Sequence, residues 1–249
     1  MPTIKELRQI CQHSAEAPSW RTQSLEGKFN RIFSIYLTWV LARTKIPVTV
    51  VNVSGMMLYI GGAFLFIFND IKWHFLGLFL MLLSFIFDAT DGELSRYRKL
   101  PKRETEFGGG FIEPVSHDIM YAFFFLPLGI GTTLVSGSLW PLLAAFMAVI
   151  GKLLFRLLEL RADALLKIWA AEKGAQVKWI QGAATPTSLL YFAYRNFFTG
   201  TGMFFILIPA AIFSRVDWFL YFYGTSFFLL WAYKMAKQWK KMRKEVNSV

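Results

Sequence analysis

Cysteine and histidine are scarce in this chain of 249 residues, which contains one cysteine and three histidines. A single thiol, Cys11, cannot build a disulfide framework or a cysteine-rich zinc site. The histidines, His13, His74 and His117, are too few and too widely separated for a site made of histidine alone. Any metal chemistry therefore depends on oxygen ligands from acidic side chains.

Acidic residues are also few, 16 against 27 lysines and arginines, whereas 55% of the residues are hydrophobic and 18% are aromatic. This is not the composition of an ordinary soluble domain, so the apolar surface is expected to face lipid. Residues 1–47 are polar and basic and lack the pattern of a cleaved signal peptide. We expect an integral membrane protein whose basic residues contact membrane lipids, with no nucleic acid as a partner.

Six apolar runs have about the length that a membrane-crossing helix needs. They are Val48–Phe68, Trp73–Asp88, Ile119–Val135, Leu139–Leu158, Phe197–Phe213 and Trp218–Met235. The pattern predicts an all-α fold in two parts, a cytoplasmic segment over 1–47 and a six-helix transmembrane domain over 48–249.

The segment Phe29–Arg43 has an amphipathic pattern. One helical stripe collects Phe29, Ile32, Phe33, Tyr36, Leu37 and Val40. We interpret it as an interfacial helix on the membrane surface. A first transmembrane span is the alternative, although the apolar stretch is shorter than the roughly 20 residues that a span needs.

Lysines and arginines gather at one end of the predicted bundle. Seven precede the first span, five lie in 96–103, six in 156–195 and six in 234–244, while the other end has Lys72 and Arg215. By the positive-inside rule, both termini and the larger loops are cytoplasmic. We therefore expect a protein of the bacterial inner membrane whose residues 88–118 face the cytoplasm.

Two polar pairs flank the basic loop between the second and third runs. Asp88 and Asp91 are three residues apart on one helix face, and Glu113 and His117 are four apart at the start of the next helix. Three carboxylates in one place repel one another unless a cation lies among them. The pattern predicts a metal site with Mg²⁺ as the simplest occupant, whereas Mn²⁺ tolerates a neighbouring histidine better. A structural ion-pair cluster at the helix ends is the alternative.

Glycines and one arginine accompany these pairs. Gly92 follows Asp91, and Gly108–Gly110 lies opposite, so a ligand has room to approach the backbone. Arg96 is one turn beyond Gly92 and is placed to meet a phosphate. The stretch is therefore suited to a flat or phosphorylated ligand.

These residues resemble the signature of the CDP-alcohol phosphotransferases, D-x-x-D-G-x-x-A-R followed by G-x-x-x-D-x-x-x-D. Here it reads Asp88-x-x-Asp91-Gly92-x-x-Ser95-Arg96 and, after a spacer of twelve residues, Gly109-x-x-x-Glu113-x-x-x-His117. Ser95 replaces the family's alanine, the spacer is longer than the family's, and Glu113 and His117 replace its third and fourth aspartates. The family architecture, an interfacial helix followed by six membrane helices, agrees with the hydropathy pattern.

The resemblance implies a metal-dependent enzyme that transfers a phospho-alcohol group from a CDP-linked lipid, such as CDP-diacylglycerol, to a hydroxyl acceptor and releases CMP. The product is a phospholipid or a related phosphodiester, and the enzyme is expected to be a homodimer. The metal is held by Asp88, Asp91 and Glu113, and His117 takes the place of the family's general base, with Asp118 as its rival. The nucleotide lies beside Gly92, Ser95, Arg96 and Gly109.

Basic residues further along the chain are candidates for binding an anionic acceptor, although positive-inside anchoring explains the same charges. They are Lys152, Arg156 and Arg195. Two other classes fit the sequence. A catalytically altered relative, acting as a membrane scaffold or subunit, is favoured by the two replaced aspartates. Another metal-dependent membrane transferase, such as a polyprenyl transferase, requires a second aspartate-rich motif, which the sequence lacks.

Overall fold

The computed structural model describes residues 2–13, 25–68, 70–100, 107–172 and 196–247. These residues form helices and the turns between them, with no strand in this part of the chain, so the predicted all-α fold is confirmed. In chain order the helices are α1 (Ile4–Cys11), α2 (Leu25–Leu41), α3 (Val48–Phe64) with the 3-10 turn η2 (Leu65–Ile67), α4 (Ile71–Arg98), the π-helical turn η3 (Gly108–Ile112), α6 (Glu113–Ser136), α7 (Trp140–Glu172), α9 (Gly200–Ile212) and α10 (Val216–Asn247).

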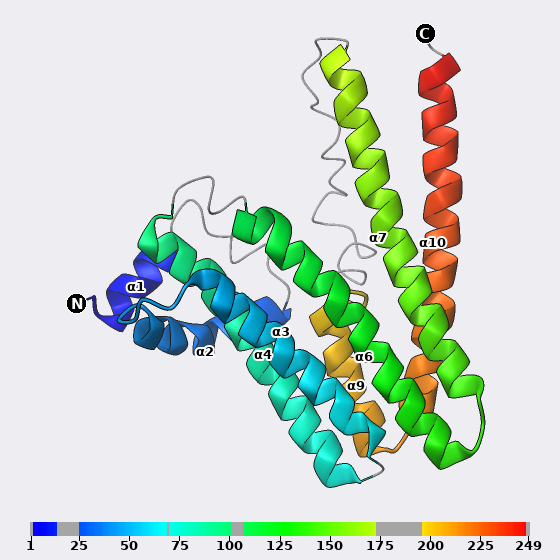
Figure 1. The fold of residues 1–249 in the computed structure, drawn as a ribbon, viewed down its shortest axis with the longest axis horizontal. Coiled ribbons are helices and arrows are strands. Elements are labelled where there is room, and N and C mark those ends of the chain that lie inside the picture. Colours follow the sequence, from blue (N-terminus) through cyan, green and yellow to red (C-terminus); the bar gives the residue numbers. More distant parts are fainter. Residues whose placement is uncertain (1, 14–24, 69, 101–106, 173–195, 248–249) are drawn as a thin grey trace.

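The long helices pack side by side as an antiparallel bundle (Figure 1). Helix α3 packs on α4 and α6, α6 packs on α7, and α7 packs on α10, while α1 and α2 lie against α4. Short connections at 65–70, 137–139 and 213–215 join the helices at one end. The opposite end therefore collects the start of α3, the end of α4 and the start of α6, which are the segments that carry the predicted site.

Four helical stretches are long and apolar enough to cross a membrane. They are Val48–Ile67, Ile71–Arg98, Gly110–Ser136 and Trp140–Leu165. The stretch Gly202–Ile212 in α9 is apolar but shorter, and α10 is not among the four. The membrane character is thus confirmed for the first four of the six predicted spans.

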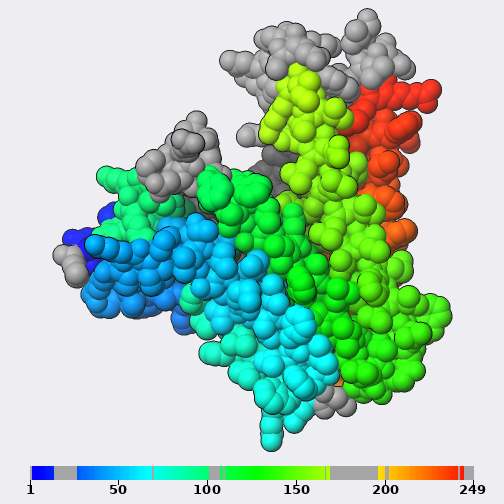
Figure 2. Space-filling model, in the orientation of Figure 1, coloured from blue at the N-terminus to red at the C-terminus, as the bar shows by residue number. Residues whose placement is uncertain are grey.

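The outer surface of this bundle is apolar. Figure 2 shows α3, α6 and α7 side by side on one face of the molecule. Large apolar side chains from these helices are exposed, among them Met57, Phe123 and Phe146. An apolar surface of this extent is unfavourable in water and matches a lipid environment.

Small residues let α3 and α4 approach closely. A Cβ atom added to Gly62 would lie 2.6 Å from the carbonyl oxygen of Gly77, and one added to Gly77 would lie 2.5 Å from that of Gly62. The two backbones therefore touch at this level, as is common where membrane helices pack through small side chains. Helix α4, which carries Asp88 and Asp91, is fixed against α3 by this contact.

Aromatic side chains fill the centre of the bundle. Phe124 and Phe125 on α6 pack against Phe219 and Tyr223 on α10, with ring centroids 5.9–6.3 Å apart between the two helices. Tyr59 on α3 lies 5.5 Å from Phe124. These five rings are almost fully buried and connect the first half of the chain to the last helix.

Helix α2 presents its apolar side outward. Its predicted stripe is mostly exposed, including Phe33, Tyr36 and Val40, whereas the polar residues Ser34 and Thr38 are buried against α4. In a soluble protein, an amphipathic helix turns its apolar side toward the core and its polar side toward water. The amphipathic helix expected over Phe29–Arg43 is therefore formed, and its outward apolar side suits contact with lipid.

Candidate metal and phosphate site

The two polar pairs predicted from the sequence meet at one end of the bundle. Oδ1 of Asp88 on α4 lies at hydrogen-bond distance, 3.1 Å, from Nε2 of His117 on α6. Asp88, Glu113 and His117 each offer a ligand atom, and these atoms lie within 4.8 Å of one another. All three side chains are partly buried. Two carboxylates and an imidazole at this spacing form a candidate divalent-cation site.

Asp91 is the most deeply buried of the predicted ligands, with 6% of its surface exposed. Its Oδ2 accepts a hydrogen bond of 2.8 Å from the amide of Asn52 on α3. The amide oxygen of Asn52 in turn accepts one of 2.9 Å from the hydroxyl of Ser116 on α6. Asp91 is thus held from a third helix, one turn from Asp88 on the same face of α4.

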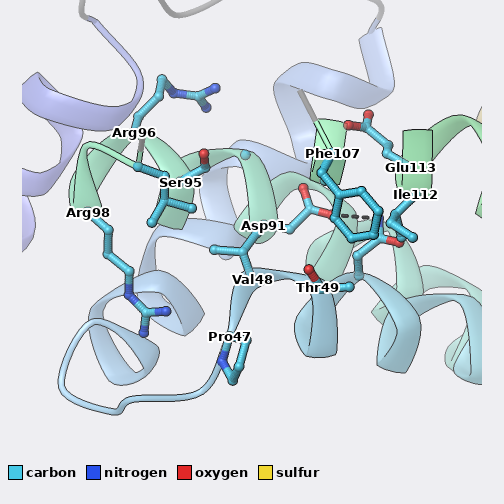
Figure 3. Close-up of a pocket in the computed structure, with 14 residues that line it drawn as sticks. Pro47, Val48, Thr49, Asp91, Ser95, Arg96, Arg98, Phe107, Ile112 and Glu113 are labelled. Atoms are coloured by element: carbon cyan, nitrogen blue, oxygen red, sulfur yellow. Dashed lines mark hydrogen bonds between the residues drawn. The ribbon is translucent and has the colours of Figure 1, made fainter. Parts of the chain in front are cut away.

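A cavity of about 650 Å³ opens beside this cluster. It is lined by the start of α3, the end of α4 and the segment that leads into α6 (Figure 3). Five predicted site residues line it, namely Asp91, Gly92, Ser95, Arg96 and Glu113. Glu113 borders both the cavity and the metal-ligand cluster, so a phosphorylated ligand in the cavity would reach the cation site.

Residues that sequence reasoning missed also line the cavity or hold its walls. Thr49 and Asn52 come from the first turns of α3, and Phe107 comes from the segment before η3. The available signals were a polar side chain within an apolar run, at Asn52, and the position of Ser116 between Glu113 and His117. Their partners are far away in sequence, which the spacing of motifs does not reveal.

Asp118, the rival base, is already paired. Its Oδ1 accepts a hydrogen bond of 3.0 Å from Nε of Arg156 on α7. Helix α6 is continuous from Glu113 to Ser136, with Pro114 in its first turn, so the residues after Pro114 are not unwound. Asp118 therefore lies about 100° around the helix from His117 and contacts α7 instead of joining the cation cluster.

The two predicted acceptor residues in the described part of the chain, Lys152 and Arg156, lie on α7. Lys152 is 5% exposed, donates a hydrogen bond of 3.1 Å to the carbonyl oxygen of Phe198, and lies 4.4 Å from the ring centre of Tyr121. Neither Lys152 nor Arg156 lines the cavity. Arg195 lies outside the described residues. Gly109 lies in the turn η3, beside the cavity-lining Gly108.

The chain was also compared with known protein families and with curated proteins, and no family model and no curated protein matches it. A function for this chain is therefore inferred from its own site and from the motif that the site contains.

Proposed function

We propose that the chain is a metal-dependent CDP-alcohol phosphotransferase. The observation that supports this most directly is the convergence of Asp88, Asp91, Glu113 and His117 from two helices at the edge of a cavity large enough for a nucleotide. The cavity also includes the glycine and arginine of the motif, Gly92 and Arg96. This combination of a cation site, open backbone and a guanidinium suits a pyrophosphate-containing ligand.

The donor set fits a divalent cation. Asp88 and Glu113 contribute oxygen atoms, and Asp91 lies one helical turn from Asp88 with its carboxylate held by Asn52. Mg²⁺ prefers this oxygen-rich surrounding, and Mn²⁺ tolerates the neighbouring imidazole better. When bound, the cation supplies charge neutralisation for the pyrophosphate and for the departing CMP.

His117 is the proposed general base. An ionised carboxylate only accepts hydrogen bonds, so the contact with Asp88 places the ring proton on Nε2 and leaves Nδ1 basic. Nδ1 takes the proton of the acceptor hydroxyl, and the acceptor oxygen forms a bond to the lipid-linked phosphorus. The bond from that phosphorus to the CMP oxygen breaks, and CMP leaves with the electron pair. Positioning and charge neutralisation supply most of what this transfer requires, without a covalent enzyme intermediate.

The membrane placement completes the proposal. The last two predicted spans, in α9 and α10, cross the bilayer with the four long apolar helices, and α1 and α2 lie at its surface. Both termini and the site then face the cytoplasm of a bacterial inner membrane, where a CDP-linked lipid such as CDP-diacylglycerol reaches the cavity from the bilayer. The hydroxyl acceptor enters from the water, and an anionic acceptor suits the basic end of the bundle.

A catalytically altered relative, acting as a scaffold, is the second candidate. It is favoured by the two positions at which Glu113 and His117 replace the family's aspartates. The test is release of CMP from CDP-diacylglycerol by the purified chain in lipid nanodiscs, with and without Mg²⁺, over a panel of neutral and phosphorylated alcohols. Magnesium-dependent release that requires an acceptor supports the enzyme. Intact donor under every condition supports the scaffold.

A further inference from the structure

A buried carboxylate joins the N-terminal helices to the site helix. Glu93 on α4 is 1% exposed and accepts hydrogen bonds of 2.7 Å from the amide of Gln12, 2.7 Å from the hydroxyl of Ser34 and 2.6 Å from the hydroxyl of Thr38. A buried carboxylate without partners costs several kcal/mol, so these donors are needed to hold it. We call these four residues the Glu93 latch.

Gln12 connects α1 to α2 as well as to α4. Its side-chain amide also donates a hydrogen bond of 2.9 Å to the carbonyl oxygen of Arg31 on α2. Leu7, Cys11 and Ile35 form a small buried apolar cluster beside it. The end of α1 is therefore fixed to α4 by one polar contact, and to α2 by a second polar contact and by apolar packing.

The last turn of α1 holds the arginine of the motif. Nε of Arg96 donates a hydrogen bond of 2.8 Å to the carbonyl oxygen of Cys11. A Cβ atom added to Gly92 would lie 3.4 Å from Nη1 of Arg96, so the guanidinium lies across the glycine, where it lines the cavity. Within the described part of the chain, the two terminal nitrogens of Arg96 have no hydrogen-bond partner.

A second arginine at the end of α4, Arg98, has different hydrogen-bond partners from Arg96. Arg98 leaves α4 in the opposite direction from Arg96 (Figure 3). Its terminal nitrogens donate to the carbonyl oxygens of Leu41, Thr44 and Ile46, between α2 and α3. Arg98 thus fixes the connection between α2 and α3, whereas the terminal nitrogens of Arg96 remain available to a ligand.

We propose that α1 is part of the phosphate-binding site, because the Glu93 latch holds the Cys11 carbonyl in the place where it orients Arg96. Gln12 and Glu93 are positioning residues that act through Arg96. With Nε bound to Cys11, both terminal nitrogens face a phosphate in the geometry that an arginine uses for two parallel hydrogen bonds. The inference rests on the proposed function in taking that phosphate to be the pyrophosphate of a CDP-linked donor.

The chain has a reporter for this coupling. Cys11 is its one cysteine, is fully buried, and belongs to the turn whose carbonyl contacts Arg96. Burial raises the pKa of the Cys11 thiol to about 11, so a docked α1 reacts slowly with a maleimide. If docking of α1 strengthens phosphate binding, phosphate binding strengthens docking by the same factor.

The experiment measures Cys11 labelling and pyrophosphate affinity in the full chain in nanodiscs, in the presence of Mg²⁺. Pyrophosphate is expected to slow the labelling of the unmodified chain. Gln12→Leu is expected to label faster and to bind pyrophosphate about tenfold more weakly. Gln9→Leu is the matched control on the exposed side of α1 and is expected to change neither quantity. Arg96→Lys is expected to abolish the effect of pyrophosphate on labelling.

Two results would overturn the inference. One is faster labelling of Gln12→Leu with unchanged pyrophosphate affinity, which would show that docking of α1 does not contribute to phosphate binding. The other is labelling of the unmodified chain that pyrophosphate does not affect, a result that needs no variant to fold. Failure of the proposed function is a separate result. If pyrophosphate slows Cys11 labelling but the chain releases no CMP from CDP-diacylglycerol, the role of the Glu93 latch is supported and the proposed enzyme activity is not.

Discussion

Asn52 on α3 donates a hydrogen bond to Asp91 on α4, across a separation of 39 residues. The hydroxyl of Ser116 donates to the oxygen of the same amide, so the amide nitrogen is turned toward the carboxylate. All three side chains are buried. Three helices thus fix the rotation of one candidate ligand before any cation binds, and such outer partners are often important to metal affinity.

Replacing Asn52 therefore tests whether Asp91 must be held. Asn52→Leu is expected to weaken Mn²⁺ binding by about 10–100-fold, because the carboxylate loses the donor that orients it. Ser116→Ala leaves Asn52 in place and is expected to have a smaller effect in the same direction. Calorimetric titration of the protein in nanodiscs gives both values. Ser54→Ala, on the same helix, is the control, and an equal loss in that variant would contradict the assignment.

Asp91 itself is expected to be indispensable. Asp91→Ala should abolish CMP release and weaken Mn²⁺ binding, while the thermal unfolding midpoint stays close to that of the unmodified chain. The control is Asp163→Ala, since Asp163 pairs with Lys167 one turn away on α7. Near-normal, magnesium-dependent turnover by Asp91→Ala would show that the cation site is elsewhere.

Phe107 and Phe111 offer a matched test of nucleotide binding. Both rings are 58% exposed and they stack on each other at 6.1 Å, but Phe107 alone of the two lines the cavity. A base stacked on an aromatic ring gains about 1–3 kcal/mol, so Phe107→Ala is expected to raise the KM for the CDP-linked donor at least severalfold. Phe111→Ala should leave that KM unchanged. Equal effects would remove Phe107 from the nucleotide site.

The sequence predicted the parts of the site that depend on helical spacing. Asp88 with Asp91, and Glu113 with His117, were placed on common faces because residues three or four apart on a helix are neighbours. Apolar runs predicted where the helices lie, although α4 continues ten residues beyond Asp88, to Arg98. Spacing alone does not show how two helices are rotated against each other.

Contacts that depend on helix packing were accordingly missed. One partner of Glu93 is Gln12, 81 residues away, and a partner of Arg96 is the Cys11 carbonyl. For Arg156, which stays a candidate for binding an acceptor, the sequence did not reveal the ion pair with Asp118 on the neighbouring helix. A lone basic residue in an apolar run has the same sequence pattern whatever its partner is.

The close approach of α3 and α4 gives a prediction about stability. In Gly62→Ala the added methyl group would lie 2.6 Å from the carbonyl oxygen of Gly77, so the helices must separate. Overpacking of this kind costs about 1–3 kcal/mol. Gly61→Ala is the matched control, because nothing lies within 4 Å of its added Cβ atom. Thermal unfolding in nanodiscs should therefore show a lower midpoint for Gly62→Ala alone, and an equal shift in both variants would contradict the contact.

The assignment of His117 as base is tested against its neighbour. His117 contacts Asp88, whereas Asp118 is paired with Arg156 about 100° around the helix. His117→Ala is expected to lower kcat by about 10²–10⁴-fold, the usual contribution of a general base. Asp118→Ala is expected to keep most of the turnover, because its side chain contacts α7 and not the cation cluster.

Metal titration separates a base from a ligand at the same position. A base can be removed without loss of the cation, so His117→Ala should bind Mn²⁺ nearly as tightly as the unmodified chain while kcat falls. If Mn²⁺ binding falls as far as in Asp88→Ala, His117 is a ligand, and another group takes the acceptor proton. An inactive Asp118→Ala variant and an active His117→Ala variant would reverse the assignment and make Asp118 the base. Because Asp118 faces Arg156, the acceptor would then have to bind between α6 and α7.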